Sequence, residues 1–237
     1  MSALTRALLG QLSINISCRI TQVQRRRQQW LLHDQNGNEH GPFSHLVLAI
    51  PAPQATALLN TAAELAAMTG SVDMQPSWAV ALAFEQPLQT SVEACFVEDN
   101  ALAWVARDSS KPGRDGQHDN WILHASDAWS AQNLELPAAA VVERLKNALS
   151  GILGCALPEP ALAQAHRWLY ARPSRAQPWG ALADATEGLH LCGDWCLSGR
   201  VEDAWHSGQL AAQQLLDQAA LNAGRTERSP ITHGGKS

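Results

Sequence analysis

The sequence predicts an α/β fold that carries an α+β insert. Two continuous apolar runs, residues 46–50 and 189–192, are typical of strands buried in a parallel sheet, and a helical pattern follows each run. Between them, polar turns separate short alternating segments, which indicates a mixed, mainly antiparallel sheet. This order predicts that the two ends of the chain build one domain and that the middle builds another.

The domain boundaries follow from these changes of pattern. We expect the first domain to comprise residues 1–70 and 181–221, and the second to comprise residues 71–180. Residues 222–237 are dominated by small and polar residues and are expected to form a disordered tail.

The first seventy residues predict a helix, a hairpin, a buried strand and a second helix. In chain order these are a helix over 1–10, strands over 14–23 and 29–33, a tight turn at Asn36-Gly37, a fully buried strand over 46–50 and a helix from Pro51. The run Arg25-Arg26-Arg27 falls between the hairpin strands, so we interpret it as a solvated turn rather than a binding patch.

The middle of the chain predicts a sheet with one long helix. The expected elements are strands over 78–84, 94–97, 102–106, 121–125 and 163–171, a loop over 109–116 and a helix over 137–153 that ends at Gly154.

Composition narrows the class of protein. The balance of 17 basic and 22 acidic residues favours neither nucleic acid nor an anionic membrane as a partner. Five cysteines, scattered and without a C-x-x-C pair, indicate reduced thiols in a cytoplasmic protein rather than a disulfide framework or a metal site. No apolar run approaches the roughly 18 residues that a membrane span needs.

The segment from Leu189 to Gly208 is the most informative part of the chain. A short apolar strand ends in Gly193-Asp194, a glycine-containing turn follows, and a helix is expected from Val201 to about residue 220. A carboxylate at a strand end accepts sugar hydroxyl protons, while amides at a helix N-terminus face the anionic part of a ligand. A dinucleotide cofactor is the leading hypothesis. The alternative, an α/β connection in which a polar residue only caps the helix, stays open.

The longer string resembles the C-terminal FAD-binding motif of flavin-containing amine oxidases. Gly193-Asp194 is followed by Gly-Arg-Val-Glu-x-Ala at 199–204, then by Ser-Gly and a helix of small residues. The resemblance implies that the Asp binds the ribityl and phosphate region and that amides at the helix start stabilise negative charge on reduced flavin. The expected cofactor-binding residues of this motif are Gly193, Asp194, Arg200, Val201, Glu202 and Ala204.

Further segments resemble one branch of that superfamily, the renalase-like NAD/FAD-dependent oxidoreductases. They are residues 1–4, 48–55 with Leu58-Leu59, 107–114 and 166–173. The resemblance implies a partial FAD/NAD(P)-binding Rossmann-like domain over the two ends and an amine-oxidase-like substrate domain in the middle. It also implies that the backbone near Ile20 contacts adenine and that Trp168 and Tyr170 line the substrate pocket. For the aromatic pair, ordinary strand packing remains an alternative.

This sequence departs from the family's pattern at the N-terminal end. Members begin with a βαβ unit whose G-x-G-x-x-G turn binds the pyrophosphate, and this sequence contains no such motif. Met1 aligns with an interior point of the family, so we expect an N-terminally truncated chain. Its two apolar strands would pair with each other and expose an edge. Loss of the phosphate anchor would weaken FAD binding by about three or more powers of ten.

The resemblance implies hydride transfer from a reduced nicotinamide-type substrate to FAD, with reoxidation by dioxygen. No general base can be named, because Lys111, Lys146 and Lys236 fall in a loop, a surface helix and the tail. A dihydronicotinamide dinucleotide needs no base, which favours it over an amine. Two alternatives stay open: an amine oxidase or desaturase of the same superfamily, and a non-catalytic remnant or interaction module that binds no flavin.

Overall fold

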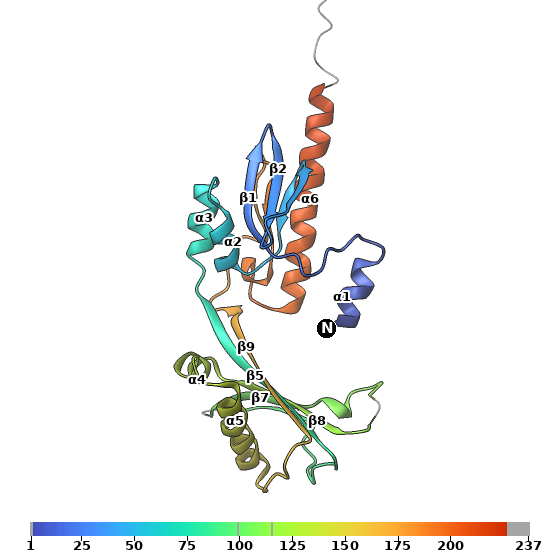
Figure 1. The fold of residues 1–237 in the computed structure, drawn as a ribbon, viewed down its shortest axis with the longest axis vertical. Coiled ribbons are helices and arrows are strands. Elements are labelled where there is room, and N and C mark those ends of the chain that lie inside the picture. The colour runs from blue at the N-terminus through green and yellow to red at the C-terminus, as the bar shows by residue number, and fades with distance from the viewer. Residues whose placement is uncertain (1, 99, 115, 227–237) are drawn as a thin grey trace, which may run out of the picture.

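The computed structural model of the 237-residue chain describes residues 2–98, 100–114 and 116–226. It consists of two units arranged along the long axis of the molecule (Figure 1). Both ends of the chain form the terminal unit, and the middle of the chain forms the middle unit. Strands β5 (Met74–Phe84) and β9 (Leu162–Pro173) connect them. The predicted α/β fold with a mainly antiparallel insert is confirmed.

The first sheet of the terminal unit is the predicted hairpin extended by a third strand. Strands β1 (Ile20–Arg26), β2 (Gln29–Asp34) and β3 (Glu39–Phe43) pair antiparallel in that order. The β1–β2 turn has φ angles of 49° at Arg27 and 67° at Gln28. Two consecutive positive φ angles suit a two-residue hairpin turn, because its twist matches that of the strands.

The expected strand over residues 14–23 is wrong in its first half. Ile14 and Ile16 are 56% and 84% exposed, and Ser17 has a φ of 56°, which interrupts an extended backbone. Strand β1 begins only at Ile20, where the pairing with β2 starts. An alternating pattern makes a strand only where a neighbouring strand accepts its hydrogen bonds.

The arginine-rich turn is solvated in part. Arg26 and Arg27 are exposed, as predicted. The Nε of Arg25, by contrast, lies 2.9 Å from Oε2 of Glu187, and its guanidinium lies over the ring of Trp30. Arg25 therefore fastens the hairpin to the loop that precedes strand β11.

The second sheet contains the two apolar runs, paired parallel as predicted. Strands β10 (Leu182–Asp184), β11 (Leu189–Leu191) and β4 (Leu46–Leu48) lie in the order β10-β11-β4, with β11 parallel to β4. Val47 is 44% exposed, so the expected fully buried strand is shorter and buried on one face only. Within the described chain β4 is an edge strand.

Four helices belong to the terminal unit: α1 (Ser2–Leu9), α2 (Ala52–Leu58), α3 (Ala63–Gly70) and α6 (Val201–Thr226). Helix α1 stands apart from the sheets, whereas α6 runs along them (Figure 1). Helix α6 continues past residue 221, where the tail was expected to begin, because residues 222–226 contain no helix-breaking proline. Residues 227–237 lie outside the described chain. No described helix is long and apolar enough to cross a membrane.

The middle unit is an antiparallel sheet covered by helices. Its strand order is β6-β7-β8-β5-β9. The remaining elements are β6 (Ala94–Phe96), β7 (Leu102–Arg107), β8 (Asp119–Ala125), α4 (Asp127–Gln132), α5 (Ala138–Leu153) and the short turn η1 (Asp108–Ser110) at the start of the expected loop. Helix α5 buries an i, i+4, i+8 row, Val141, Leu145 and Leu149, against the sheet, and ends at Gly154 in the left-handed conformation, as predicted.

Candidate functional site

The candidate site begins at the turn between β11 and α6, which contains the short helix η2 (Asp194–Cys196). The indole Nε1 of Trp195 donates a hydrogen bond to the carbonyl of Ile50, 3.0 Å away, just beyond β4. The amide of Gly193 donates to the buried hydroxyl of Ser207 on α6, at 3.0 Å. These two bonds hold the turn between the end of the parallel strand pair and the helix.

Two glycines shape this turn for packing reasons. A Cβ on Gly193 would lie 2.4 Å from Nε1 of Trp195, so the glycine makes room for the indole, and a close approach to a ligand is not needed to explain it. Gly199 has a φ of 90°, and a Cβ there would lie 2.7 Å from the ring of Pro173. The end of β9 thus packs directly on the turn, which brings the middle unit to the candidate site.

Asp194 provides a carboxylate that is ready for a donor. The side chain is half-buried, and this burial raises the pKa of its carboxyl group; hydrogen bonds from the backbone amides of Trp195 and Asp194 offset part of the rise, and the negative charge of Asp203 adds a smaller increase. In the part of the chain that the structure describes, no other side chain donates a hydrogen bond to it. A hydroxyl group of a ligand would supply such a donor and stabilise the ionised form.

The N-terminus of α6, which follows this turn along the chain, has amides without a protein acceptor among the described residues. Asp203 caps the helix, because its Oδ2 accepts the amides of Ser198 and Arg200 at 3.1 and 3.0 Å as well as the Ser198 hydroxyl. The amides of Val201 and Glu202 have no protein acceptor among the described residues. They are free to face an anionic group, whose charge the helix dipole also favours.

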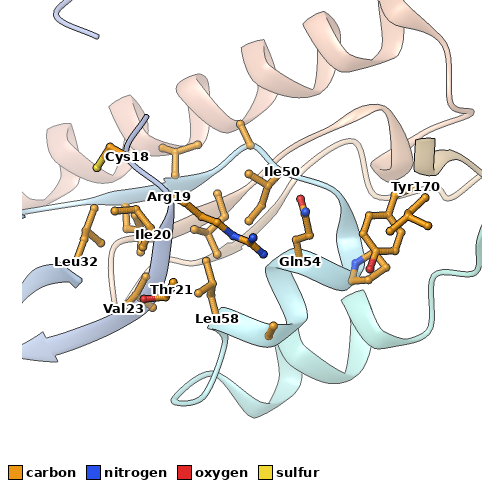
Figure 2. Close-up of a pocket in the computed structure, with 17 residues that line it drawn as sticks. Cys18, Arg19, Ile20, Thr21, Val23, Leu32, Ile50, Gln54, Leu58 and Tyr170 are labelled. Carbon is orange, nitrogen blue, oxygen red and sulfur yellow. The ribbon is translucent and has the colours of Figure 1, made fainter. Parts of the chain in front are cut away.

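A cavity of about 730 Å³ lies against β4 (Figure 2). Its wall comes from β1, β4 and α2 and is mostly apolar, and Tyr170 of β9 contributes one end. Ile20 and Tyr170, two predicted site residues 150 positions apart, therefore line the same cavity. Ile50 lines it as well and accepts the hydrogen bond of Trp195, so the Asp194 turn adjoins this cavity.

Two polar side chains that sequence reasoning missed extend into this cavity, Arg19 and Gln54 (Figure 2). Arg19 directly precedes Ile20, and Gln54 follows the proline pair at the start of α2. The available signals were weak: Arg19 adjoins Ile20 in the expected adenine strand, and Gln54 lies in the segment 48–55 that carries the family resemblance. A guanidinium and an amide in an apolar wall suit the polar edge of a flat heterocycle or a phosphate.

The remaining predicted residues lie at the surface around the turn. Trp168 is 54% exposed and does not line the cavity, although its ring packs edge-on against His166 at 4.4 Å. Arg200, directly before α6, and Ala204 on α6 are exposed. Trp205, on α6, is also exposed, at 56%.

The lysines give no candidate base at the site. Nζ of Lys111 lies 2.7 Å from Asp108, and Nζ of Lys146 lies 3.0 Å from Glu143. Neither lines the cavity, and Lys236 lies outside the described residues.

Several solved structures share the fold of this chain. Among solved structures, a candidate protoporphyrinogen oxidase from Exiguobacterium sp. 255-15 matches with a TM-score of 0.67 and 15% identity, over 91% of this chain and 51% of that chain. Putrescine oxidase bound to putrescine matches with a TM-score of 0.62 and 13% identity, over 94% and 52%. Cyclohexylamine oxidase from Brevibacterium oxydans IH-35A matches with a TM-score of 0.61 and 13% identity, over 85% and 48%.

At these identities the likeness concerns the fold, and the chain spans about half the length of the solved structures it matches. The family model for flavin containing amine oxidoreductases matches residues 1–216, which is most of the sequence. The chain therefore belongs to the flavin-containing amine oxidoreductase family.

Proposed function

We propose that this chain provides part of the FAD site and substrate site of an oxidoreductase. One observation carries the proposal: the half-buried Asp194 carboxylate accepts no side-chain hydrogen bond among the described residues, and its turn leads into α6, where the Val201 and Glu202 amides have no protein acceptor. A ribityl chain supplies hydroxyl donors, and the ring of a reduced flavin supplies a delocalised negative charge. The residues present fit these two parts of the cofactor.

Each part of the site has a distinct task in this proposal. Asp194 would hold the ribityl hydroxyls, and the start of α6 would face the anionic edge of the ring. The apolar cavity beside Ile20 would hold the adenine, with Arg19 and Gln54 at its polar atoms. When bound, FAD supplies an acceptor for a hydride and passes the electrons to dioxygen. Gly193, Arg200 and Ala204 would support the turn rather than contact the cofactor.

For the substrate, we propose a reduced nicotinamide dinucleotide. His166 and Trp168 lie two positions apart on β9 and their rings pack against each other with centroids 4.4 Å apart, and Tyr170 follows two positions later. Aromatic rings at an exposed site suit stacking with a flat nicotinamide ring. Hydride transfer from such a ring needs no general base, and both described lysines are in ion pairs.

A small amine is the second candidate. The aromatic row of β9 also suits a substrate cation, because the faces of Trp and Tyr rings attract positive charge. Two of the structural neighbours are a putrescine oxidase and a cyclohexylamine oxidase.

The test is FAD binding by the purified chain, followed by reduction. Equilibrium dialysis against FAD would give saturable binding that Asp194→Asn weakens and that Asp217→Asn, an exposed change on α6, leaves unchanged. Loss of the visible absorption of oxidised flavin under anaerobic conditions then identifies the substrate. Bleaching by dihydronicotinamides supports the first candidate, and bleaching by putrescine or cyclohexylamine supports the second. Absence of FAD binding would contradict the proposal and favour a non-catalytic remnant or interaction module.

A further inference from the structure

Three side chains with metal-ligand chemistry converge beside the first sheet. Sγ of Cys18 lies 3.5 Å from Nε2 of His40 and 4.0 Å from Oδ2 of Asp34, and the latter two atoms are 3.1 Å apart. In a tetrahedral zinc site, bonds of 2.0–2.3 Å place neighbouring ligand atoms about 3.3–3.6 Å apart. The three observed distances lie around these values. We infer that Cys18, Asp34 and His40 bind a divalent cation that accepts thiolate, such as Zn²⁺.

The alternative arrangement, a nucleophilic Cys-His-Asp relay, does not fit this geometry. In such a relay one ring nitrogen of the histidine faces the thiol and the other faces the carboxylate. Here the same atom, Nε2 of His40, faces both Cys18 and Asp34. Three ligand atoms around a common point are what a single cation requires. The fourth position of the tetrahedron remains for water or a further ligand.

The local fold orients Asp34 for this task. Its Oδ1 accepts the backbone amides of Asn36 and Asn38 at 2.8 and 3.0 Å, which fixes the carboxylate plane. Its Oδ2, which also accepts the side-chain amide of Asn38, is thereby turned toward Cys18 and His40. Hydrogen bonds that hold a ligating carboxylate in place are a regular part of metal sites. The thiol and the imidazole are partly exposed, so an ion from solvent can reach them.

Binding would fasten the segment before β1 to the β2–β3 hairpin. Asp34 ends β2 and His40 lies in β3, whereas Cys18 comes from the segment that leads into β1. Cys18 also lines the cavity two positions before Ile20 (Figure 2). The cation would therefore fix one end of the cavity wall. Binding releases the thiol proton of Cys18 to solvent, so the affinity rises with pH.

Cobalt provides a direct test, because a thiolate–Co²⁺ bond gives an intense near-ultraviolet charge-transfer band. The full chain, free of any affinity tag and stripped with a chelator, is titrated with CoCl₂. We expect a band that saturates at one equivalent and that ZnCl₂ displaces. Cys18→Ser abolishes the band, and His40→Gln weakens binding by about tenfold or more. Asp34→Asn is avoided, because this side chain also builds the turn.

Matched control variants come from the same chain. Cys155→Ser changes an exposed thiol, and His33→Gln changes a histidine of the same hairpin that lies near Glu39. Both should keep the band at one equivalent. Zn²⁺ should raise the melting temperature of the wild type and of both controls but not of Cys18→Ser. A band or a Zn²⁺-induced shift that persists in folded Cys18→Ser, or the lack of any band in the wild type, would overturn the inference. If Cys18→Ser does not fold, full-strength binding by His40→Gln overturns it instead.

Discussion

The half-buried carboxyl group of Asp194 lowers the stability of the free protein when it is ionised. Burial raises the pKa of its carboxyl group, so the ionised form is destabilising at neutral pH. The strand end and the Trp195 anchor hold the carboxylate in place despite this cost. In the proposed function, a hydroxyl group of the ligand would donate a further hydrogen bond to this carboxylate and offset the cost.

The variant Asp194→Asn separates the stability cost of the ionised carboxyl group from its proposed contribution to FAD binding. The amide keeps the shape and removes the charge, so the variant should melt at the same temperature as the wild type or higher at pH 7. FAD affinity should fall by about 1.5–3 kcal/mol, the contribution of a hydrogen bond to a charged group. Thermal denaturation and equilibrium dialysis give the two quantities.

The stability of the wild type should depend on pH in the direction set by the raised pKa of Asp194. Because the folded pKa of Asp194 lies above the unfolded value, the penalty applies at neutral pH and disappears as the pH falls through the folded pKa. FAD affinity should fall over the same pH range, since the hydroxyl donors prefer the ionised carboxylate. In Asp194→Asn this pH dependence should be absent, and its persistence would assign the effect to another group.

Gly199 illustrates a residue fixed by backbone geometry. Alanine there has to adopt a φ of 90° and meets Pro173 of β9 at 2.7 Å. We expect Gly199→Ala to lower the free energy of unfolding by about 1–3 kcal/mol. The control is Gly208→Ala in α6, where a Cβ meets nothing within 4 Å and which should raise stability by about 0.5–1 kcal/mol. Urea denaturation measures both, and equal effects would contradict the strain argument.

Among the elements, strand β8 is fixed at its start by the buried side chain of Asp119. Burial alone would raise the pKa of this carboxyl, but the Arg107 guanidinium and the amide of Leu88 outweigh it and lower the pKa below the usual value. Nε of Arg107 lies 2.6 Å away, and the hydroxyl of Ser109 donates at 2.8 Å. One carboxylate thereby ties β8 to β7, to η1 and to the loop after β5.

Asp119→Ala should destabilise the protein by about 3–5 kcal/mol, because it leaves the largely buried Arg107 without its partner. Asp108→Ala removes a more exposed carboxylate from Lys111 and Arg114 and should cost less than about 1 kcal/mol. The folded pKa of Asp119 is lowered, so its contribution is present above the unfolded pKa of about 3.9 and is lost as the pH falls below it. Denaturation at pH 7 and pH 3 should show the difference from wild type shrinking at the lower pH.

Elements with local signals at both ends were predictable, and those that depend on distant partners were not. Helix α5 has a proline before it and Gly154 after it, and its bounds agree with the expectation. Residues 14–19 have a good strand pattern but no partner strand among the described elements, and they are not a strand. The same limit applies to the sites. The family resemblance named Ile20 and Tyr170, but the meeting of Cys18 with His40 depends on the pairing of β2 with β3.

At the scale of the whole molecule, the terminal and middle units have separate cores. The terminal core contains Trp30, Leu48 and Leu191, and the middle core contains Leu82, Trp121 and Leu145. The buried residues of one core do not include those of the other. Strands β5 and β9 are the main continuous connection between the units (Figure 1). The units should therefore respond separately to a local loss of packing.

Leu145→Ala measures this independence. The side chain is fully buried in the middle core, so its truncation should cost about 2–5 kcal/mol. Hydrogen exchange should rise in β7, β8 and α5 and stay unchanged in β4 and β11. Leu216→Ala, an exposed change on α6, serves as control and should alter stability by less than about 0.5 kcal/mol. A uniform rise in exchange across both units would show a single cooperative body instead.

Because its tryptophan side chains differ in burial, the protein has an intrinsic fluorescence signal that can report ligand binding. Trp168 on β9 and Trp205 on α6 are exposed to solvent. Three other tryptophans are buried: Trp30, Trp121 and Trp195. The fluorescence emission of solvent-exposed indoles lies at longer wavelengths than that of buried indoles. Iodide in solution quenches only the indoles that it can contact. A planar ligand that covered either of these exposed indoles would protect it from iodide, so reduced quenching would report binding of the ligand there.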